Sequence, residues 1–332
     1  MSKVAINGLG RIGRATFKII LDTPELECVA VNDLVPAETL AYLLKYDSVY
    51  GRFPRKVDHD SEGLIVDGNH YKLLNEKDPA ALPWGHMGVE IAFECTGRFT
   101  NKDDLEKHVK AGAKHAILSA PSKGNDMATV IHGVNQTDGS VEVLSCASCT
   151  TNCIAPVAEI MDRRIGVEKA IMTTIHAYTS SQMIVDSPSK KVRRGRAGAV
   201  NLVPTSTGAA KATSKVLPQY ENKFDGIAVR APVPCGSVAD LVFLTKRETS
   251  VEEVNEIFRE EARSERYNGI LGVADDPVVS SDIIQDSRAS IVDAEMTQVV
   301  GGNLVKVLSW YDNEWGYSQQ MVREAVALLK QA

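Results

Sequence analysis

The sequence predicts an α/β fold in which a domain with a parallel, helix-covered sheet is followed by an α+β domain with a mostly antiparallel sheet. Two patterns carry this prediction. In the first half, short apolar strands alternate with amphipathic helices, which is typical of a parallel sheet covered by helices. After residue 148 the expected strands become longer and a basic loop appears. A chain of 332 residues is also long enough for two domains.

The composition is that of an ordinary globular protein, with 44% hydrophobic and 24% charged residues. The net charge of −6 gives no reason to expect nucleic-acid or membrane binding. A strand begins almost at once, so we expect no targeting peptide, and no apolar run approaches the roughly 20 residues that span a bilayer. The six cysteines lack metal-type spacing, which favours reduced thiols, no bound metal and a cytoplasmic location.

A glycine-rich turn lies between the first expected strand, residues 3–7, and a helix that runs to Leu21. It reads GLGRIG, the G-x-G-x-x-G pattern in the strand-to-helix context that dinucleotide binding requires. In this context Gly8 permits the tight turn, Gly10 lets backbone N–H groups approach a pyrophosphate, and Gly13 allows close helix–strand packing. The pattern predicts a Rossmann-type domain.

An acidic residue follows the second expected strand, residues 26–32. Asp33 lies 20 residues after Gly13, where a dinucleotide-binding domain places the carboxylate that binds the ribose. A glycine turn followed by an ordinary strand-end aspartate is the structural alternative. A carboxylate here repels a 2′-phosphate and Leu34 offers no compensating donor, which favours NAD over NADP.

The rest of the first half continues the same alternation. We expect strands at residues 89–95 and 115–119 with a helix at 102–112 between them, and an antiparallel insertion at 58–75. No internal repeat or low-complexity linker divides the chain. The domain boundary is therefore expected near Cys149, without a flexible tether.

The stretch from Ser145 to Cys153 has the composition of a nucleophile site. Ser148 is a suitable N-cap for a helix that continues over residues 154–165, so Cys149 is expected at the helix N terminus. There the N–H groups and the helix dipole lower the pKa of a thiol toward the thiolate that attacks carbon. A small buried apolar cysteine is the structural alternative, and the polar neighbours argue against it.

In the second half, an expected strand over residues 168–178 carries His176 near its end. A histidine paired with Cys149 would be the general base that thiol chemistry needs, although a lone histidine is more often structural. The polar segment 179–201 contains five basic residues and reads equally well as a solvated loop or as an anion-binding or subunit-contact loop. Residues 204–211 lead into a helix with hydroxyls and a glycine, which suits a phosphate or ordinary capping.

Further elements complete the second half. Strands are expected at residues 226–230, 238–248 and 304–311, and helices at 251–264 and 318–330. The last helix is amphipathic, with one apolar face that can pack on a core.

Several longer motifs resemble those of one enzyme family. They are, in order, residues 5–14, LKYDS at 44–48, ASCTTN at 147–152, STGAAK at 206–211 and WYDNE at 310–314. Over essentially its whole length the sequence resembles the phosphorylating glyceraldehyde-3-phosphate dehydrogenases. The resemblance implies an NAD-binding domain at residues 1–148, a catalytic domain at 149–317, and a C-terminal helix, 318–332, that packs back on the first domain.

The resemblance implies an oxidoreductase of glycolysis and gluconeogenesis. It would oxidise glyceraldehyde 3-phosphate with NAD and inorganic phosphate to 1,3-bisphosphoglycerate. In the implied mechanism the Cys149 thiolate forms a hemithioacetal and then a thioester, His176 takes the hydroxyl proton, and inorganic phosphate attacks the thioester. The family is usually a homotetramer in which the loop at residues 179–201 reaches a neighbouring subunit's cofactor site.

The resemblance also assigns binding residues. For the cofactor they are Gly8, Gly10, Arg11, Ile12, Gly13, Asp33, Lys77, Thr96, Ser119, Asn313 and Tyr317. For the substrate phosphate and the attacking phosphate they are Ser148, Thr150, Thr179, Arg196, Thr207, Gly208 and Arg230.

One departure from the family lies close to the chemistry. Relatives usually carry asparagine where this chain has Cys146. A thiol at this position is a second candidate partner, beside Cys153, for an oxidised Cys149. The alternative is that Cys146 points into the core and never meets Cys149.

Two other functions share much of this sequence pattern. An erythrose-4-phosphate dehydrogenase would carry the same Cys149 and His176, but Thr179 and the pair Thr207-Gly208 favour the triose enzyme. An NAD-binding, redox-sensing protein without catalysis is the alternative from another class. The presence of cysteine, histidine and arginine together at the implied site argues against it.

Overall fold

The chain folds into two units, which the computed structural model describes over residues 1–331. Unit 1 comprises residues 1–132 and 136–147 together with the chain from residue 321 onward. Unit 2 comprises residues 133–135 and 148–320. The first division falls one residue before the expected boundary, and the short piece 133–135 has no counterpart in the sequence-based division.

Unit 1 contains most of the short elements. Its strands are β1 (Ser2–Asn7), β2 (Leu26–Asn32), β3 (Tyr46–Asp47), β4 (Gly51–Arg52), β5 (Val57–His59), β6 (Gly63–Val66), β7 (Asn69–Leu74), β8 (Ile91–Glu94), β9 (His115–Leu118), β10 (Ala128–Thr129) and β11 (Val143–Ser145). Its helices are α1 (Arg11–Ile20), α2 (Ala37–Lys45), α3 (Trp84–Met87) and α4 (Lys102–Lys110).

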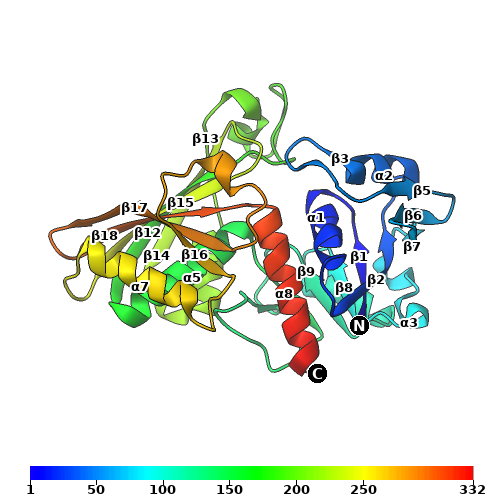
Figure 1. The fold of residues 1–332 in the computed structure, drawn as a ribbon, viewed down its shortest axis with the longest axis horizontal. Coiled ribbons are helices and arrows are strands. Elements are labelled where there is room, and N and C mark those ends of the chain that lie inside the picture. Colours follow the sequence, from blue (N-terminus) through cyan, green and yellow to red (C-terminus); the bar gives the residue numbers. More distant parts are fainter. Residues whose placement is uncertain (332) are drawn as a thin grey trace. The chain divides into compact units, whose positions relative to one another are not determined.

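The main sheet of unit 1 has the strand order β10-β11-β9-β8-β1-β2-β7-β6-β5. Figure 1 labels the part of this sheet from β9 to β5. Every pair from β10 to β7 is parallel, and the β7-β6-β5 edge is antiparallel, which confirms the expected insertion. Val4, Ala5 and Ile6 of the central strand are fully buried, as an apolar strand covered on both faces must be. The chain leaves β1 for β2 on one side and returns to β8 on the other, so the switch point where such sheets bind nucleotides lies at β1 and β8.

Unit 2 has fewer and longer elements. They are α5 (Cys149–Arg164), β12 (Val167–Ala177), β13 (Val203–Ser206), α6 (Ala209–Val216), β14 (Phe224–Ala231), β15 (Ser237–Thr245), α7 (Val251–Arg263), β16 (Leu271–Ala274), β17 (Ser290–Val300) and β18 (Leu304–Tyr311). Helix α8 (Trp315–Gln331) begins in unit 2 and ends in unit 1.

The sheet of unit 2 is mostly antiparallel, as expected. Its order is β13-β14-β12-β15-β18-β17-β16, and only the pairs β12-β14 and β16-β17 are parallel. Helices α5, α6 and α7 pack against this sheet, and Figure 1 labels α5 and α7. The segment at residues 179–201 contains two short 3-10 turns and an isolated bridge between Met183 and Ala197, in agreement with its lack of periodicity.

The sequence did not reveal every element. Strand β17 was missed because the acidic residues Asp293 and Glu295 interrupt its apolar pattern. The register with β18 also shifts between Asp293 and Gln298, which breaks the alternation of faces. Here pairing with a neighbouring strand, rather than local preference, decides the structure.

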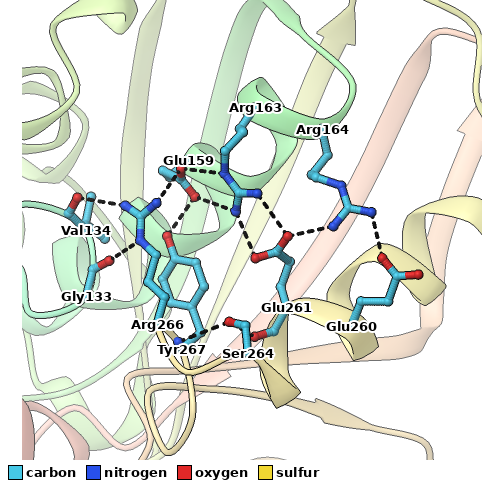
Figure 2. Close-up of polar contacts among 10 residues, drawn as sticks. All are labelled: Gly133, Val134, Glu159, Arg163, Arg164, Glu260, Glu261, Ser264, Arg266 and Tyr267. Atoms are coloured by element: carbon cyan, nitrogen blue, oxygen red, sulfur yellow. Dashed lines mark hydrogen bonds and ion pairs between the residues drawn. The ribbon is translucent and has the colours of Figure 1, made fainter.

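A cluster of charged side chains and one tyrosine joins helices α5 and α7 within unit 2 (Figure 2). Its members are Glu159, Arg163, Arg164, Glu260, Glu261, Arg266 and Tyr267. Glu261 is 8% exposed and accepts from Arg163 at 2.8 Å and from Arg164 at 2.6 Å. The hydrogen bonds from Arg163, opposed by burial, lower the pKa of Glu261. The cluster therefore holds a nearly buried carboxylate in its charged form.

We expect Glu261→Gln to lower the free energy of unfolding at pH 7 by about 1–2 kcal/mol, since the two arginines are partly exposed and screened. The pKa of Glu261 is lowered by folding, so its contribution is present above the unfolded pKa of about 4.3 and is lost as pH falls through the folded value. Urea unfolding should thus show a difference in the free energy of unfolding between the parent chain and Glu261→Gln at pH 7, and this difference should become smaller below pH ~4. Glu256→Gln, on the same helix but 55% exposed, is the control. A difference in the free energy of unfolding that is the same at pH 7 and below pH ~4 would contradict the prediction.

Candidate active site

The nucleophile candidate stands at the start of α5, as the sequence predicts. Strand β11 leads through Ala147, whose φ of +52° is rare for a residue with a side chain and turns the chain sharply. Ser148 caps the helix, because its hydroxyl accepts from the backbone N–H of Thr151 at 3.2 Å. Cys149 is the first residue of the helix and is partly exposed. Its sulfur therefore lies beside N–H groups that favour negative charge.

His176, near the end of β12, faces this cysteine. Its Nε2 lies 3.4 Å from Sγ of Cys149, and its Nδ1 lies 2.7 Å from the carbonyl oxygen of Ala177. When Nδ1 donates to that carbonyl, Nε2 presents a lone pair to the thiol and can take its proton. Sequence reasoning paired these two side chains, and the structure brings them together.

Burial lowers the pKa of His176 to about 3, with a further contribution from the Arg230 guanidinium. The imidazole is consequently neutral at pH 7, which is the form that acts as a base. Arg230 Nη1 also donates to the Ala177 carbonyl at 2.9 Å and lies 2.7 Å from Nδ1 of His176. A guanidinium only donates, so the contact with Nδ1 is a hydrogen bond only in the tautomer that carries its proton on Nε2.

The pKa of Cys149 differs from the sequence-based expectation. Burial raises it above its ordinary value, while the Arg230 charge and hydrogen bonds from Thr150 oppose the rise. The sequence-based prediction of a lowered pKa at the helix N terminus was therefore wrong, because burial has the larger effect. At Cys153, one turn further along the helix, burial raises the pKa to about 12. The resting pair is a thiol beside a neutral imidazole.

Arg230 reaches the site through sheet register. Strands β12 and β14 pair in parallel with His176 opposite Arg230. Burial lowers the pKa of this arginine, and the charge of Cys149 opposes that change. Within the described residues its Nε has no hydrogen-bond partner although it is buried. A buried donor without a partner in the protein is suited to bind an anionic ligand.

A second cation, Arg194, accompanies Arg230. Its Nε donates to the hydroxyl of Thr205 at 3.0 Å, and its charge contributes to the lowered pKa of both His176 and Arg230. The structure does not bring Arg196 into this group. Arg196 is 64% exposed and binds Asp186 at 2.7 Å. The segment lacks periodicity, so nothing in the sequence indicates which arginine turns inward.

The hydroxyl residues expected at the phosphate sites lie on three elements of unit 2. Thr207 and Gly208 precede α6, and the Thr207 hydroxyl accepts from the N–H of Ala209 at 3.2 Å. Thr179 follows β12 and its hydroxyl lies 2.8 Å from that of Ser181. The N termini of α5 and α6 thus supply further partial positive charge for anions.

Tyr311 is a site residue to which sequence reasoning assigned no role. Its hydroxyl lies 3.0 Å from that of Thr150 and 2.8 Å from that of Thr174. Its ring meets the His176 ring edge-on, with 5.9 Å between the centroids. The only signal in the sequence was its position in the WYDNE motif. Tyr311 packs the base and orients a hydroxyl of the residue that follows Cys149.

The glycine loop of unit 1 has the geometry of a pyrophosphate cradle. Gly8 has a φ of +95°, and a Cβ on Gly13 would lie 1.9 Å from the carbonyl oxygen of Gly8. A Cβ on Gly10 would meet nothing within 4 Å, so the loop is open on that side. In the described part of the chain no side chain caps the start of α1 at Gly10. The loop fits a bound dinucleotide.

The other expected cofactor residues of unit 1 follow neighbouring strands. Asp33 follows β2, and its Oδ2 accepts from the N–H of Leu9 at 2.7 Å. The Arg11 side chain binds Asp47 at 2.6 Å, so a cofactor role falls to its backbone and to that of Ile12. Lys77 follows β7 and is exposed, whereas Thr96 and Ser119 follow β8 and β9 and are partly buried. In a parallel sheet these positions share one edge.

Asn313 and Tyr317, assigned to the cofactor by resemblance, lie in unit 2. Asn313 follows β18 and is 5% exposed, and its Oδ1 accepts from the Ser237 hydroxyl at 3.0 Å. Tyr317 is buried in the first turn of α8.

Cys146 is buried in unit 1. Its side chain is 3% exposed, and burial raises its pKa well above the ordinary value of a thiol. A thiol in this form is a poor partner in disulfide exchange. This environment favours the interpretation in which Cys146 belongs to the core.

Comparisons with known proteins agree with the geometry. Residues 2–102 match the family described as glyceraldehyde 3-phosphate dehydrogenase, NAD binding domain, and residues 148–313 match its C-terminal domain. The chain is 49% identical to the glyceraldehyde-3-phosphate dehydrogenase of Streptomyces coelicolor over 324 residues, 96% of each chain. It is also 49% identical to that of Thermotoga maritima over 334 residues, 99% of this chain and 100% of the relative.

The described residues contain neither a candidate metal site nor a candidate membrane-spanning helix. Within residues 1–331 there is no group of three or more histidine, cysteine, aspartate or glutamate side chains that could hold a metal ion. In the same part of the chain no helix combines the length and the apolar character that crossing a membrane requires.

Proposed function

The chain belongs to the glyceraldehyde-3-phosphate dehydrogenase family, and from that premise we infer that it oxidises glyceraldehyde 3-phosphate with NAD and inorganic phosphate through a thioester on Cys149. The observation that carries the chemistry is the 3.4 Å contact between Sγ of Cys149 and Nε2 of His176 at the N terminus of α5. NAD, when bound, accepts the hydride from C1 of the substrate.

The cofactor is held mainly by backbone and small polar groups. The backbone N–H groups from Gly10 to Gly13 bind the pyrophosphate, and Asp33 accepts from the adenosine ribose. Gly8 and Gly13 make room for this loop. As the family resemblance implies, Lys77, Thr96 and Ser119 line the adenine and nicotinamide side, Asn313 holds the carboxamide, and Tyr317 packs nearby.

The oxidation begins with a proton transfer. His176 takes the thiol proton as Sγ of Cys149 forms a bond to the aldehyde carbon, and it returns the proton to the carbonyl oxygen to give a hemithioacetal. The same Nε2 then removes the hydroxyl proton while the hydride leaves C1, which yields the thioester. The imidazole is neutral between these steps, because burial, together with the Arg230 charge, lowers the pKa of His176.

Inorganic phosphate completes the reaction. A phosphate oxygen attacks the thioester carbon, the carbon–sulfur bond breaks, and His176 returns its proton to the departing sulfur. Thr179 and Arg230 form one of two anion sites, and Ser148, Thr150, Thr207 and Gly208 form the other. Between them the two sites hold the phosphate of the substrate and the attacking phosphate. Arg194 supports these anions in place of Arg196.

A paired substitution tests the choice of arginine. We expect Arg194→Gln to raise the KM for inorganic phosphate about tenfold or more, since a lost charge-assisted hydrogen bond is worth about 1.5–3 kcal/mol. Arg196→Gln removes a surface ion pair with Asp186 and should change this KM less than about twofold. Initial rates measured at several concentrations of inorganic phosphate give this KM for the parent chain and for both variants. A larger effect at Arg196 would favour Arg196, the residue that the family resemblance assigns to this site.

A spectrophotometric assay tests the whole function. Reduction of NAD by glyceraldehyde 3-phosphate should continue past a single turnover only with inorganic phosphate, because phosphate releases the thioester. NADP should be used with lower efficiency, since the Asp33 carboxylate repels a 2′-phosphate. Steady turnover without phosphate would exclude the phosphorylating reaction, and equal or better use of NADP would exclude the role of Asp33.

The chain assembles as a homotetramer in this proposal. Five apolar side chains of unit 2 that the monomer leaves 69–90% exposed support it: Ile184, Val185, Val192, Val200 and Leu202. They lie on the basic segment and beside it, where the family places a subunit contact. Such exposure marks an interface. Light scattering should give four times the chain mass of 36.0 kDa, and a monomer would refute the assembly.

We further propose a cytoplasmic location. Within residues 1–331 the six cysteines form no disulfide, which agrees with a reducing compartment. Fractionation of cells that produce the protein would test the location directly.

A further inference from the structure

A fully buried carboxylate, Glu94, ends strand β8 and takes no part in the chemistry above. Its Oε1 accepts from both the backbone N–H of Thr96, at 2.8 Å, and the Thr96 hydroxyl. Its Oε2 accepts from Nδ2 of Asn7 at 2.6 Å and faces Nε2 of His108 at 3.1 Å. A carboxylate accepts about four hydrogen bonds, so this environment uses its full capacity.

Trp84 fixes the proton position on His108. The indole N–H can only donate, and it lies 3.0 Å from Nδ1 of His108, so Nδ1 accepts and the proton lies on Nε2. Nε2 therefore donates to Glu94. The four donors around Glu94 come from Asn7, Thr96 and a neutral imidazole, and none is cationic. Burial of a carboxylate in such surroundings is costly, which indicates that the group supplies geometry rather than stability.

The hydrogen bonds continue from Glu94 across the carboxyl edge of the sheet. Asn7 accepts at Oδ1 from Nδ2 of Asn32, at 2.7 Å. Asn32 donates to the carbonyl of Glu76 at 2.9 Å and accepts from its N–H at 2.9 Å. The three residues that this series of hydrogen bonds links each precede an expected cofactor residue by one position. They are Asn7 before Gly8, Asn32 before Asp33 and Glu76 before Lys77.

Thr96 connects the same carboxylate to the glycine loop. A Cβ on Gly8 would lie 2.8 Å from the backbone nitrogen of Thr96, so the two backbones are in direct contact. The two hydrogen bonds from Thr96 to Glu94 hold that contact closed. The backbone carbonyl of Glu94 also accepts from the N–H of Ser119 at 3.0 Å.

We propose that Glu94 is a positioning residue for NAD, which sets the spacing of the loops that follow β1, β2, β7 and β8. It does not touch the cofactor; it holds in register the residues that do. The proposal rests on the NAD site of the proposed function. It concerns binding alone, so it is testable apart from the reaction.

Glu94→Gln is the direct test. A glutamine has one acceptor oxygen and a donating NH2, so its amide must face either the Thr96 donors or those of Asn7 and His108. We expect the Kd for NAD, measured by calorimetry, to rise about tenfold or more, as for buried donors left without an acceptor. Alkylation of Cys149 without NAD should keep its rate, because that site lies in unit 2. Glu90→Gln, a surface ion pair with Lys114, is the control with unchanged Kd.

A compensating variant separates positioning from general damage. In Glu94→Gln/Asn7→Asp the carboxylate moves to position 7, where it accepts both from the amide introduced at position 94 and from Asn32, so part of the NAD affinity should return. A second pair covers the case in which Glu94→Gln does not fold. His108→Gln keeps a donor for Glu94 and an acceptor for Trp84 and should bind NAD like the parent chain, whereas His108→Leu should bind more weakly.

Two results would overturn the proposal. One is a Kd for NAD within about twofold of the parent in Glu94→Gln, or in His108→Leu if the first variant does not fold. The other is a parallel loss of NAD affinity and of Cys149 alkylation, which shows unfolding rather than misplaced loops. If the parent chain itself does not bind NAD, the proposed function fails, and the two failures are thus distinct.

Discussion

Replacing Cys149 by serine is expected to lower the dehydrogenase rate by about 10⁴-fold or more, the usual loss when a catalytic nucleophile is removed. A hydroxyl is a far weaker acid than a thiol. His176, whose pKa burial lowers to about 3, is too weak a base to compensate. The serine hydroxyl would still face the imidazole, but no nucleophile would form.

The affinity for NAD should change less than about threefold in Cys149→Ser, since most of the proposed cofactor contacts belong to unit 1 and a thiol-to-hydroxyl change removes little surface. Cys153→Ser is the matched control. Cys153 lies one turn further along α5, is fully buried, and has a pKa that burial raises to about 12. That variant should retain most of its activity. Normal turnover in Cys149→Ser, or an equal loss of rate in Cys149→Ser and Cys153→Ser, would contradict the role of Cys149 as the nucleophile.

The parts of the site that were predictable depend on local rules. An N-cap, a glycine turn and a strand-end acid each act within a few residues, so Ser148, Gly8 and Asp33 were all recognisable in the sequence. Their surroundings in the structure follow from the same rules. The start of α5 at Cys149 is an example, because Ser148 bonds only three residues ahead.

The parts that were missed depend on distant packing. The inward turn of Arg194 rather than Arg196 is decided by its bond to Thr205, across an irregular segment. The raised pKa of Cys149 results from burial, which neighbouring residues in the sequence do not report. Glu94 and His108 meet only once β8 and α4 have packed. Long-range contacts of this kind leave no periodic signal in the chain.

His176→Asn should lower the rate of oxidation by roughly 10²–10⁴, the usual contribution of a positioned acid–base group. Asparagine fills part of the same space but cannot take a proton from the thiol or from the hemithioacetal. Alkylation of Cys149 by iodoacetamide at pH 7 should also slow, because Nε2 no longer assists loss of the thiol proton. His59→Asn, at an exposed position of unit 1, is the control. Unchanged alkylation would show that the pairing has no effect on the sulfur.

The same variant has a signature in stability that a purely steric role would not produce. The folded pKa of His176 is about 3, below its ordinary 6.5. As pH falls from 6.5, the unfolded chain binds a proton here and the folded chain does not, so the stability of the parent chain should decline toward pH 3. His176→Asn removes that part of the decline. Denaturant unfolding at about pH 7 and about pH 4.5 should therefore show a flatter profile for the variant. Parallel profiles would mean that the folded imidazole titrates near its ordinary pKa, and the claim that burial keeps the base neutral would fail.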